Sequence, residues 1–115
     1  MSYRLTPAAA QDIADILRET ARIFGPLQRA RYAGLLEQAA DLVAAEPERT
    51  GSRRREDFGP GIRSFHVELA ARRRGAASHV LYYVQARFED GSEGVIIARV
   101  FHKSMEPARH LPELP

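Results

Sequence analysis

Cations, an imidazole and a phenol near the ends of expected strands are the side chains of this sequence that could do chemistry. They are Arg63, Tyr83, Arg99, His102 and Lys103. Such a set could bind a phosphodiester and stabilise the charge that develops during its cleavage, with His102 as acid or base. If the chain is a nuclease, Arg63, His102 and Lys103 are the expected catalytic residues. The same cations could equally bind an acidic peptide.

Several established signatures of catalysis are missing. The glycines at 59 and 61 lack the Lys and Ser/Thr of a phosphate-binding loop, and no serine nucleophile motif occurs. The four histidines, at 66, 79, 102 and 110, fall on different expected elements, and the chain has no cysteine. No pair of carboxylates stands out as an acid/base couple. We therefore expect neither a metal site nor a cofactor.

The basic residues are clustered although the net charge is only +2. Eight arginines lie between positions 49 and 74, against Glu56, Asp57 and Glu68. Such a field favours an acidic partner, either a nucleic acid or a protein segment rich in Asp and Glu. Within this stretch, residues 46–60 form a loop rich in turn residues that contains Arg53, Arg54 and Arg55. It is either a solvated connector or a mobile arm that meets the partner.

His102 and Lys103 are expected at the exposed end of a central strand, residues 95–101. Apolar side chains occupy both of its faces, which is typical of a strand inside a sheet. Alternation puts Val95, Ile97, Arg99 and Phe101 on one face and Ile96, Ala98, Val100 and His102 on the other. Arg99 therefore favours a structural ion pair, whereas for His102 and Lys103 a structural and a functional role are both open. A helical turn is expected over residues 105–111, between Pro107 and Pro112.

The remaining elements form a scaffold for that strand. Residues 3–5 predict a short strand, Thr6 caps a helix that runs to Phe24, and Gly25 ends it before a second helix over residues 26–45. Apolar stripes on both helices, the first of them running from Ile13 to Phe24, indicate an antiparallel hairpin. Strands follow over residues 62–69 and 78–88, and the Asp90-Gly91 turn joins the second to the central strand.

These elements predict one α+β domain over residues 1–115. An N-terminal antiparallel helix hairpin packs on a roughly four-stranded antiparallel sheet, with a short C-terminal helical turn. Arg63 shares a face with Phe65 and Val67, so it either pairs with a carboxylate at the sheet edge or contributes a cation to a pocket. No apolar run is long enough to span a membrane and no signal peptide is present, so we expect a cytoplasmic protein.

Four stretches in order resemble the ParE branch of the ParE/RelE superfamily, the toxins of bacterial type II toxin–antitoxin pairs. They are residues 3–9 (YRLTPAA) with Asp12 and Ile13, residues 59–65 (GPGIRSF), residues 79–83 (HVLYY) and residues 98–111 (ARVFHKSMEPARHL). The similarity covers nearly the whole chain, and it implies the same RelE/ParE-like fold.

The resemblance also implies a function. ParE-like toxins block DNA gyrase and are neutralised by an antitoxin whose C-terminal part wraps over the toxin. We therefore expect a ParD-like antitoxin with a disordered, acidic, amphipathic segment, and a hetero-oligomer of the two. Expected partner contacts are Arg63, Tyr83, Arg99, His102 and Lys103, with the loop residues Arg53, Arg54 and Arg55. Direct sequence-specific DNA binding and membrane binding are not expected.

Two alternatives to gyrase inhibition stay open. RelE-like relatives cut messenger RNA on the ribosome and commonly use a Tyr near the C-terminus, but no Tyr follows Lys103 here. His102 could take its place, which keeps an endoribonuclease as the first alternative. The second is an inactive member that only binds its antitoxin. The position after Tyr82 and Tyr83, often Arg in the family, is Val84 in this chain.

Overall fold

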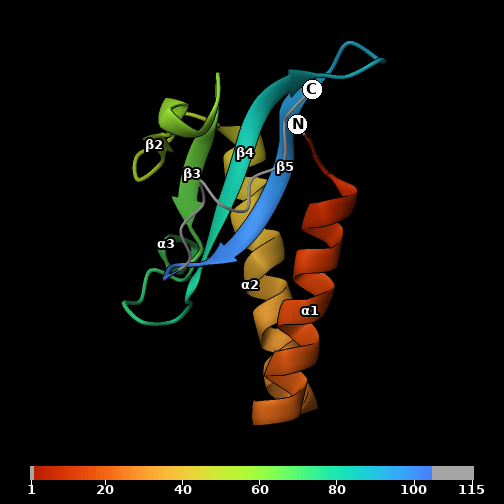
Figure 1. The fold of residues 1–115 in the computed structure, drawn as a ribbon, viewed down its shortest axis with the longest axis vertical. Helices are drawn as coiled ribbons and strands as arrows, with labels where there is room; N and C mark the ends of the chain where they lie inside the picture. Colours follow the sequence, from red (N-terminus) through yellow and green to blue (C-terminus); the bar gives the residue numbers. More distant parts are fainter. Residues whose placement is uncertain (1, 105–115) are drawn as a thin grey trace.

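The computed structural model describes residues 2–104 and arranges them in two layers, a helix hairpin and a twisted sheet (Figure 1). The helical turn expected over residues 105–111 lies outside the described residues. Both helices cover the same face of the sheet, and their hairpin extends past its lower end in this view (Figure 1). The predicted α+β architecture is therefore confirmed.

The two helices have the predicted bounds, α1 over Pro7–Phe24 and α2 over Pro26–Ala45. The Thr6 hydroxyl accepts a hydrogen bond from the Ala9 N–H at 3.0 Å, which satisfies one of the donors left over at the start of α1. Gly25 joins the helices with a φ of 89°, a conformation that glycine adopts without strain. No helix among the described residues is long and apolar enough to cross a membrane.

The sheet has five strands in the order β1-β5-β4-β3-β2. Their bounds are β1 Ser2–Leu5, β2 Arg53–Arg54, β3 Arg63–His66, β4 His79–Arg87 and β5 Glu93–His102. The strand over residues 95–101 was correctly predicted to lie inside the sheet, because β5 lies between β1 and β4. The prediction of about four antiparallel strands was wrong in two respects: β2 adds a fifth strand, and β1 pairs with β5 in parallel. Parallel pairing needs a long connection, and the chain between β1 and β5 supplies it with the helix hairpin and three other strands.

Two further predictions were wrong in detail. The strand expected over residues 62–69 ends at His66, because Val67 has a helical backbone conformation and the short helix α3, Glu68–Ala71, follows. The segment expected as a loop, residues 46–60, instead contains β2 and a single turn of 3-10 helix, η1, over Glu56–Phe58. Pairing of β2 with β3 holds this segment against the sheet.

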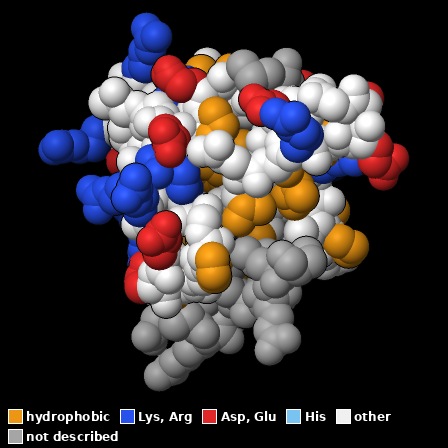
Figure 2. Space-filling view, turned by 90° about the horizontal axis from the view of Figure 1, so that it is seen from above, with side chains coloured by type: hydrophobic (Ala, Val, Ile, Leu, Met, Phe, Trp, Pro, Cys, Tyr) orange, Lys and Arg blue, Asp and Glu red, His pale blue; other side chains and the backbone are white. Residues whose placement is uncertain are grey.

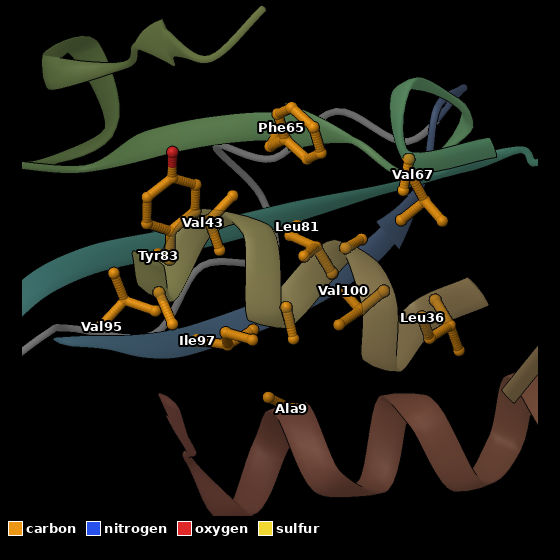
Figure 3. Packing of buried hydrophobic residues seen from close by; sticks show 14 of the residues in the cluster. Ala9, Leu36, Val43, Phe65, Val67, Leu81, Tyr83, Val95, Ile97 and Val100 are labelled. Carbon is orange, nitrogen blue, oxygen red and sulfur yellow. The ribbon is translucent and has the colours of Figure 1, made fainter. Parts of the chain in front are cut away.

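The main core lies between the helices and the sheet (Figure 3). Tyr83 and Phe65 are its largest buried side chains, and α2 contributes Leu36 and Val43. A smaller cluster on the opposite face joins Ile62, Tyr82 and Phe101. The sheet is therefore apolar on both faces, as the central strand's sequence indicated.

A β-bulge in β5 changes the predicted alternation of that strand. Tyr82 pairs with Arg99 but the next residue of β4, Tyr83, pairs with Ile97, so Ala98 has no partner in the register. The extra residue shifts every later side chain to the opposite face. Val100 therefore packs in the helix-side core, whereas Phe101 lies on the other face.

Gly94 allows the close approach of β1 to β5. A Cβ at this position would lie 1.9 Å from the carbonyl oxygen of Ser2, well inside any permitted contact. Only a residue without a side chain can occupy this position while β1 stays paired.

Candidate functional site

Arg99 forms the structural ion pair that its place in an apolar strand predicted. Its Nε and Nη2 atoms donate to the two carboxylate oxygens of Asp12 in α1, at 2.7 and 2.8 Å. The backbone N–H of Val100 also donates to Asp12, at 3.0 Å. The carboxylate thus continues the hydrogen bonding of β5 beyond the end of β1, and it raises the pKa of Arg99 above its usual value. Arg99 and Asp12 together fasten α1 to the central strand.

Arg63 and Tyr83 converge on one carbonyl oxygen, that of Pro47. The Arg63 Nε donates to it at 3.1 Å and the Tyr83 hydroxyl at 2.6 Å. Arg63 also donates to the Ser52 Oγ at 2.6 Å. Among the described residues Arg63 forms no salt bridge, so a carbonyl and a hydroxyl take the place of the carboxylate that one of its two interpretations required. Tyr83 has no exposed surface, and burial raises the pKa of its hydroxyl. Both side chains hold the segment after α2 against the sheet.

Arg53, Arg54 and Arg55 lie at the outer edge of the sheet. The first two are exposed on β2. Arg55 lies 3.5 Å from a carboxylate oxygen of Asp57, and its guanidinium lies 4.2 Å from the centre of the Phe58 ring. Arg54 lines an open groove of about 540 Å³ with Arg63, Val84, Glu48 and Glu56. This groove therefore joins two predicted site residues, in mixed-charge surroundings.

His102 and Lys103 are exposed where β5 leaves the sheet. The Nδ1 of His102 lies 2.7 Å from the Ser104 hydroxyl, and its ring lies edge-on to His79 with centroids 5.5 Å apart. The backbone N–H of Lys103 donates to the Ser78 carbonyl at 2.8 Å. In the part of the chain that the structure describes, the Lys103 side chain has no salt bridge.

The three expected nuclease residues are not brought together. Arg63 pairs with Tyr83 and His102 pairs with His79, so the two positions lie four residues apart along β4. At about 3.3 Å per residue their backbones are separated by about 13 Å along the sheet. Arg63 is in addition committed to Pro47 and Ser52. Within residues 2–104, no three His, Asp or Glu side chains are arranged to hold a metal ion.

A histidine that the sequence interpretation did not single out lies half-buried at the same end of the sheet. The Nδ1 of His79 is 2.7 Å from the Tyr32 hydroxyl, which also accepts the Ser78 N–H at 3.2 Å. We assign the hydroxyl proton to the bond with Nδ1, which requires a neutral imidazole. Burial, with the nearby His102 and His66, lowers the pKa of His79 to about 4. A histidine on the same strand face as Leu81 and Tyr83 was the sequence signal for this contact.

The turn that follows α3 was predicted, but its arginines were not among the candidate site residues. Arg72, Arg73 and Arg74 are exposed there, and Arg72 has a φ of 54°, in the left-handed region. Glu68 accepts the Gly75 N–H at 2.9 Å, and that bond, followed by the fields of His66, Lys103 and Arg74, lowers the pKa of Glu68. These groups therefore lie close enough to interact at one end of the sheet.

The helix hairpin exposes apolar side chains that the core does not use. At its tip Ile23, Phe24 and Leu27 are 52%, 67% and 61% exposed. Phe24 was expected in the packed stripe of α1, but it lies beyond the end of the sheet. A crease of about 200 Å³ between the helices and β1 is lined by Leu5, Ile13, Leu17 and other apolar side chains. Exposed apolar patches of this kind favour a protein partner.

Comparison with known proteins supplies the family context. Residues 3–107 match the family model described as the ParE toxin of the type II toxin–antitoxin system parDE. The chain is 31% identical over 110 residues to Toxin ParE1 of Caulobacter vibrioides, which covers 95% of this chain and 96% of that protein.

Proposed function

We propose that this chain, which belongs to the ParE toxin family of type II toxin–antitoxin systems, acts by binding and inhibiting DNA gyrase. It works as an inhibitor rather than as a nuclease, and it acts in the cytoplasm. Membership of the family makes an antitoxin its partner.

The dispersal of the expected nuclease residues is the observation that carries this proposal. General acid/base catalysis needs its groups within hydrogen-bond reach of one substrate. Arg63 is held by Pro47 and lies about 13 Å along the sheet from His102. A toxin that acts by binding has no such requirement.

The predicted partner contacts divide into residues that support the fold and residues whose side chains are free to meet a partner. Arg63, Tyr83 and Arg99 stabilise the scaffold, as their hydrogen bonds indicate. Arg53, Arg54, His102 and Lys103 remain proposed partner contacts, because their side chains are exposed. Val84, at the position that is often Arg in the family, lines the groove beside Arg54.

The antitoxin segment fits the hairpin. A ParD-like segment that is disordered alone, acidic and amphipathic would place apolar side chains in the crease beside Leu5 and over the exposed tip. Its carboxylates would meet arginines of the toxin surface. Binding should weaken only partly at high salt, because apolar burial remains when charges are screened. The resulting complex is a hetero-oligomer.

Supercoiling of relaxed plasmid by gyrase, with purified antitoxin-free protein, tests the proposal. We expect inhibition with accumulation of cleaved DNA, reversed by the antitoxin. A parallel assay of RNA cleavage on ribosomes should show none. RNA cleavage that depends on His102, shown by its loss in His102→Ala, would overturn the proposal in favour of a nuclease. No effect in either assay, together with harmless expression, would identify an inactive member that only binds its antitoxin.

A further inference from the structure

We propose that Arg72, Arg73, Arg74 and Lys103, together called the basic end, bind the phosphate backbone of duplex DNA without reading its sequence. The inference deepens the proposed function and rests on it for one point only, that the DNA is the segment held by gyrase. The toxin would then contact both the enzyme and its DNA.

The fold brings the four cations to one end of the sheet from two separate segments. Lys103 follows β5, and its backbone donates to Ser78 just before β4. The arginines precede β4, and the carbonyl of Arg73 accepts the Ala76 N–H at 3.2 Å. Glu68 lies near both segments, since the positive charges of Lys103 and Arg74 both contribute to lowering the pKa of its carboxylate.

The charge of the basic end is largely uncompensated. None of its four cations forms a salt bridge with a carboxylate of residues 2–104, whereas Arg18, Arg22, Arg55, Arg87 and Arg99 each form one. Glu68 accepts the Gly75 N–H and lies near Lys103 and Arg74, so one carboxylate offsets part of the four positive charges without a salt bridge. Exposed like charges repel one another, so an anion that bridges them is favoured. Arginine suits a phosphate well, because its planar guanidinium can donate two parallel hydrogen bonds.

The phosphate backbone of a nucleic acid fits this surface better than an amphipathic peptide does. A segment that folds on binding needs apolar surface to offset its lost conformational entropy. The large exposed apolar side chains of the described residues lie mostly on β1 and at the hairpin tip: Leu5, Ile23, Phe24 and Leu27. The remaining one, Leu69 on α3, lies beside Gly51 and is 46% exposed, so one of these apolar side chains is near the basic end. Binding at the basic end would therefore depend mainly on charge, as contacts to the DNA backbone do.

The backbone at Arg72 supports a role for its side chain. A left-handed conformation at a residue other than glycine is strained, and such strain is often kept at functional sites. Glycine would fit the same turn without strain. Gly75 in the same turn also has a positive φ and is a glycine. Position 72 carries an arginine instead, although its backbone conformation alone would favour glycine.

Fluorescence anisotropy with a labelled 24-base-pair duplex of arbitrary sequence tests the inference on the full chain. Salt is varied, and the slope of log K against log salt counts the phosphates neutralised. We compare Arg73→Ala/Arg74→Ala with the charge-matched control Arg18→Ala/Arg87→Ala, whose arginines are exposed in surface ion pairs away from the basic end. Losing two phosphate contacts should reduce the slope by about 1.8 and affinity about tenfold or more at low salt, whereas the control should lose much less.

Three results would overturn the inference. The first is no binding of the duplex at low salt. The second is an equal loss in the two double variants, which would mean that only net charge matters. The third is that polyglutamate of equal charge, or single-stranded RNA, competes as well as duplex DNA, which would make the basic end a site for another partner. Thermal unfolding of each variant verifies that the fold is retained.

Failure of this inference is distinguishable from failure of the proposed function. If Arg73→Ala/Arg74→Ala inhibits gyrase as well as the unmodified protein and binds DNA unchanged, the inference fails and gyrase inhibition stands. If the unmodified protein binds duplex through these arginines but leaves supercoiling untouched, gyrase inhibition fails and the DNA site stands.

Discussion

The arginines at the two ends of the sheet differ in how many partners the fold gives them. At the end that carries β2, Arg63 is held by Pro47 and Ser52, and Arg55 contacts Asp57 and the Phe58 ring, although Arg53 and Arg54 beside them are exposed. Figure 2, seen from this end, shows basic and acidic side chains intermingled. At the other end, Arg72, Arg73 and Arg74 project from a turn with no salt bridge to any described residue. In the sequence these arginines belong to one basic stretch.

The difference shows that charge clustering in sequence is a poor guide to a binding surface. An arginine with carbonyl, hydroxyl or carboxylate partners contributes to the fold, because its charge is already stabilised. An exposed arginine without partners contributes little to stability and remains available to a ligand. Substitutions should therefore affect stability in one group and binding in the other.

The largest loss of stability is expected for Asp12→Ala. This change leaves the half-buried Arg99 without its carboxylate and the Val100 N–H without an acceptor. We expect the free energy of unfolding to fall by about 2–4 kcal/mol. Urea denaturation measures it, with Asp15→Ala as the control, because Asp15 pairs with Arg18 on the exposed side of the same helix. The control should lose no more than about 0.5 kcal/mol, and similar losses in both would contradict the structural role of Asp12.

Arg63→Ala comes next. It removes the donors to Pro47 and Ser52, so the segment after α2 loses two of its attachments to the sheet. A loss of about 1–3 kcal/mol is expected in the same denaturation experiment. Arg54→Ala, on the neighbouring strand but exposed, should change stability by less than about 0.5 kcal/mol. Equal effects would mean that Arg63 belongs with the exposed arginines.

His79, which lies beside the basic end, should behave as part of the fold. Its folded pKa of about 4 lies below the value of 6.5 for an unperturbed histidine. As the pH falls from 6.5 towards 4, the unfolded chain binds a proton that the folded chain does not, so stability declines over this window. His66, His102 and the Tyr32 hydroxyl face this histidine and favour the neutral form.

After discounting for partial exposure, the loss should be about 1–2 kcal/mol. Denaturation at pH 7 and pH 4.5, for the unmodified protein and for His79→Gln, isolates the contribution because other titrations are common to both. The decline should be smaller in His79→Gln, and an equal decline would assign the pH dependence to other groups.

The smallest effect is expected for Arg72→Gly. Glycine accommodates the left-handed backbone but adds flexibility to the unfolded chain, so these contributions partly cancel. Thermal unfolding should show stability unchanged or raised by up to about 1 kcal/mol, while duplex binding weakens. A loss of more than about 1 kcal/mol would show that the Arg72 side chain stabilises the fold.

Local patterns predicted the elements of the fold well. Thr6, Gly25 and the apolar stripes fixed the bounds of both helices, and the Asp90-Gly91 turn placed the hairpin between β4 and β5. Predictions failed where a non-local partner decided the outcome. Strand β2 exists because β3 offers it a neighbour, and the bulge at Ala98 depends on the register of β4. No local pattern contains that information.

The candidate site divides in the same way. The sequence identified exposed candidates at Arg53, Arg54, His102 and Lys103, and it favoured an ion pair for Arg99 because a charge in an apolar strand needs a partner. It could not name Asp12 as that partner, 87 residues away along the chain. Nor could it show that Arg63 and Tyr83 share the Pro47 carbonyl.

The sequence by itself determined the helices, the apolar central strand and the family, because these depend on local spacing and on matching residues along the chain. Only the tertiary structure decided which cations are neutralised by the fold and which are left at the surface. The reason is physical: the cost of a charge depends on the carboxylates, carbonyls and water within a few ångströms of it. Those neighbours come from distant segments, which meet only when the sheet and the hairpin have formed.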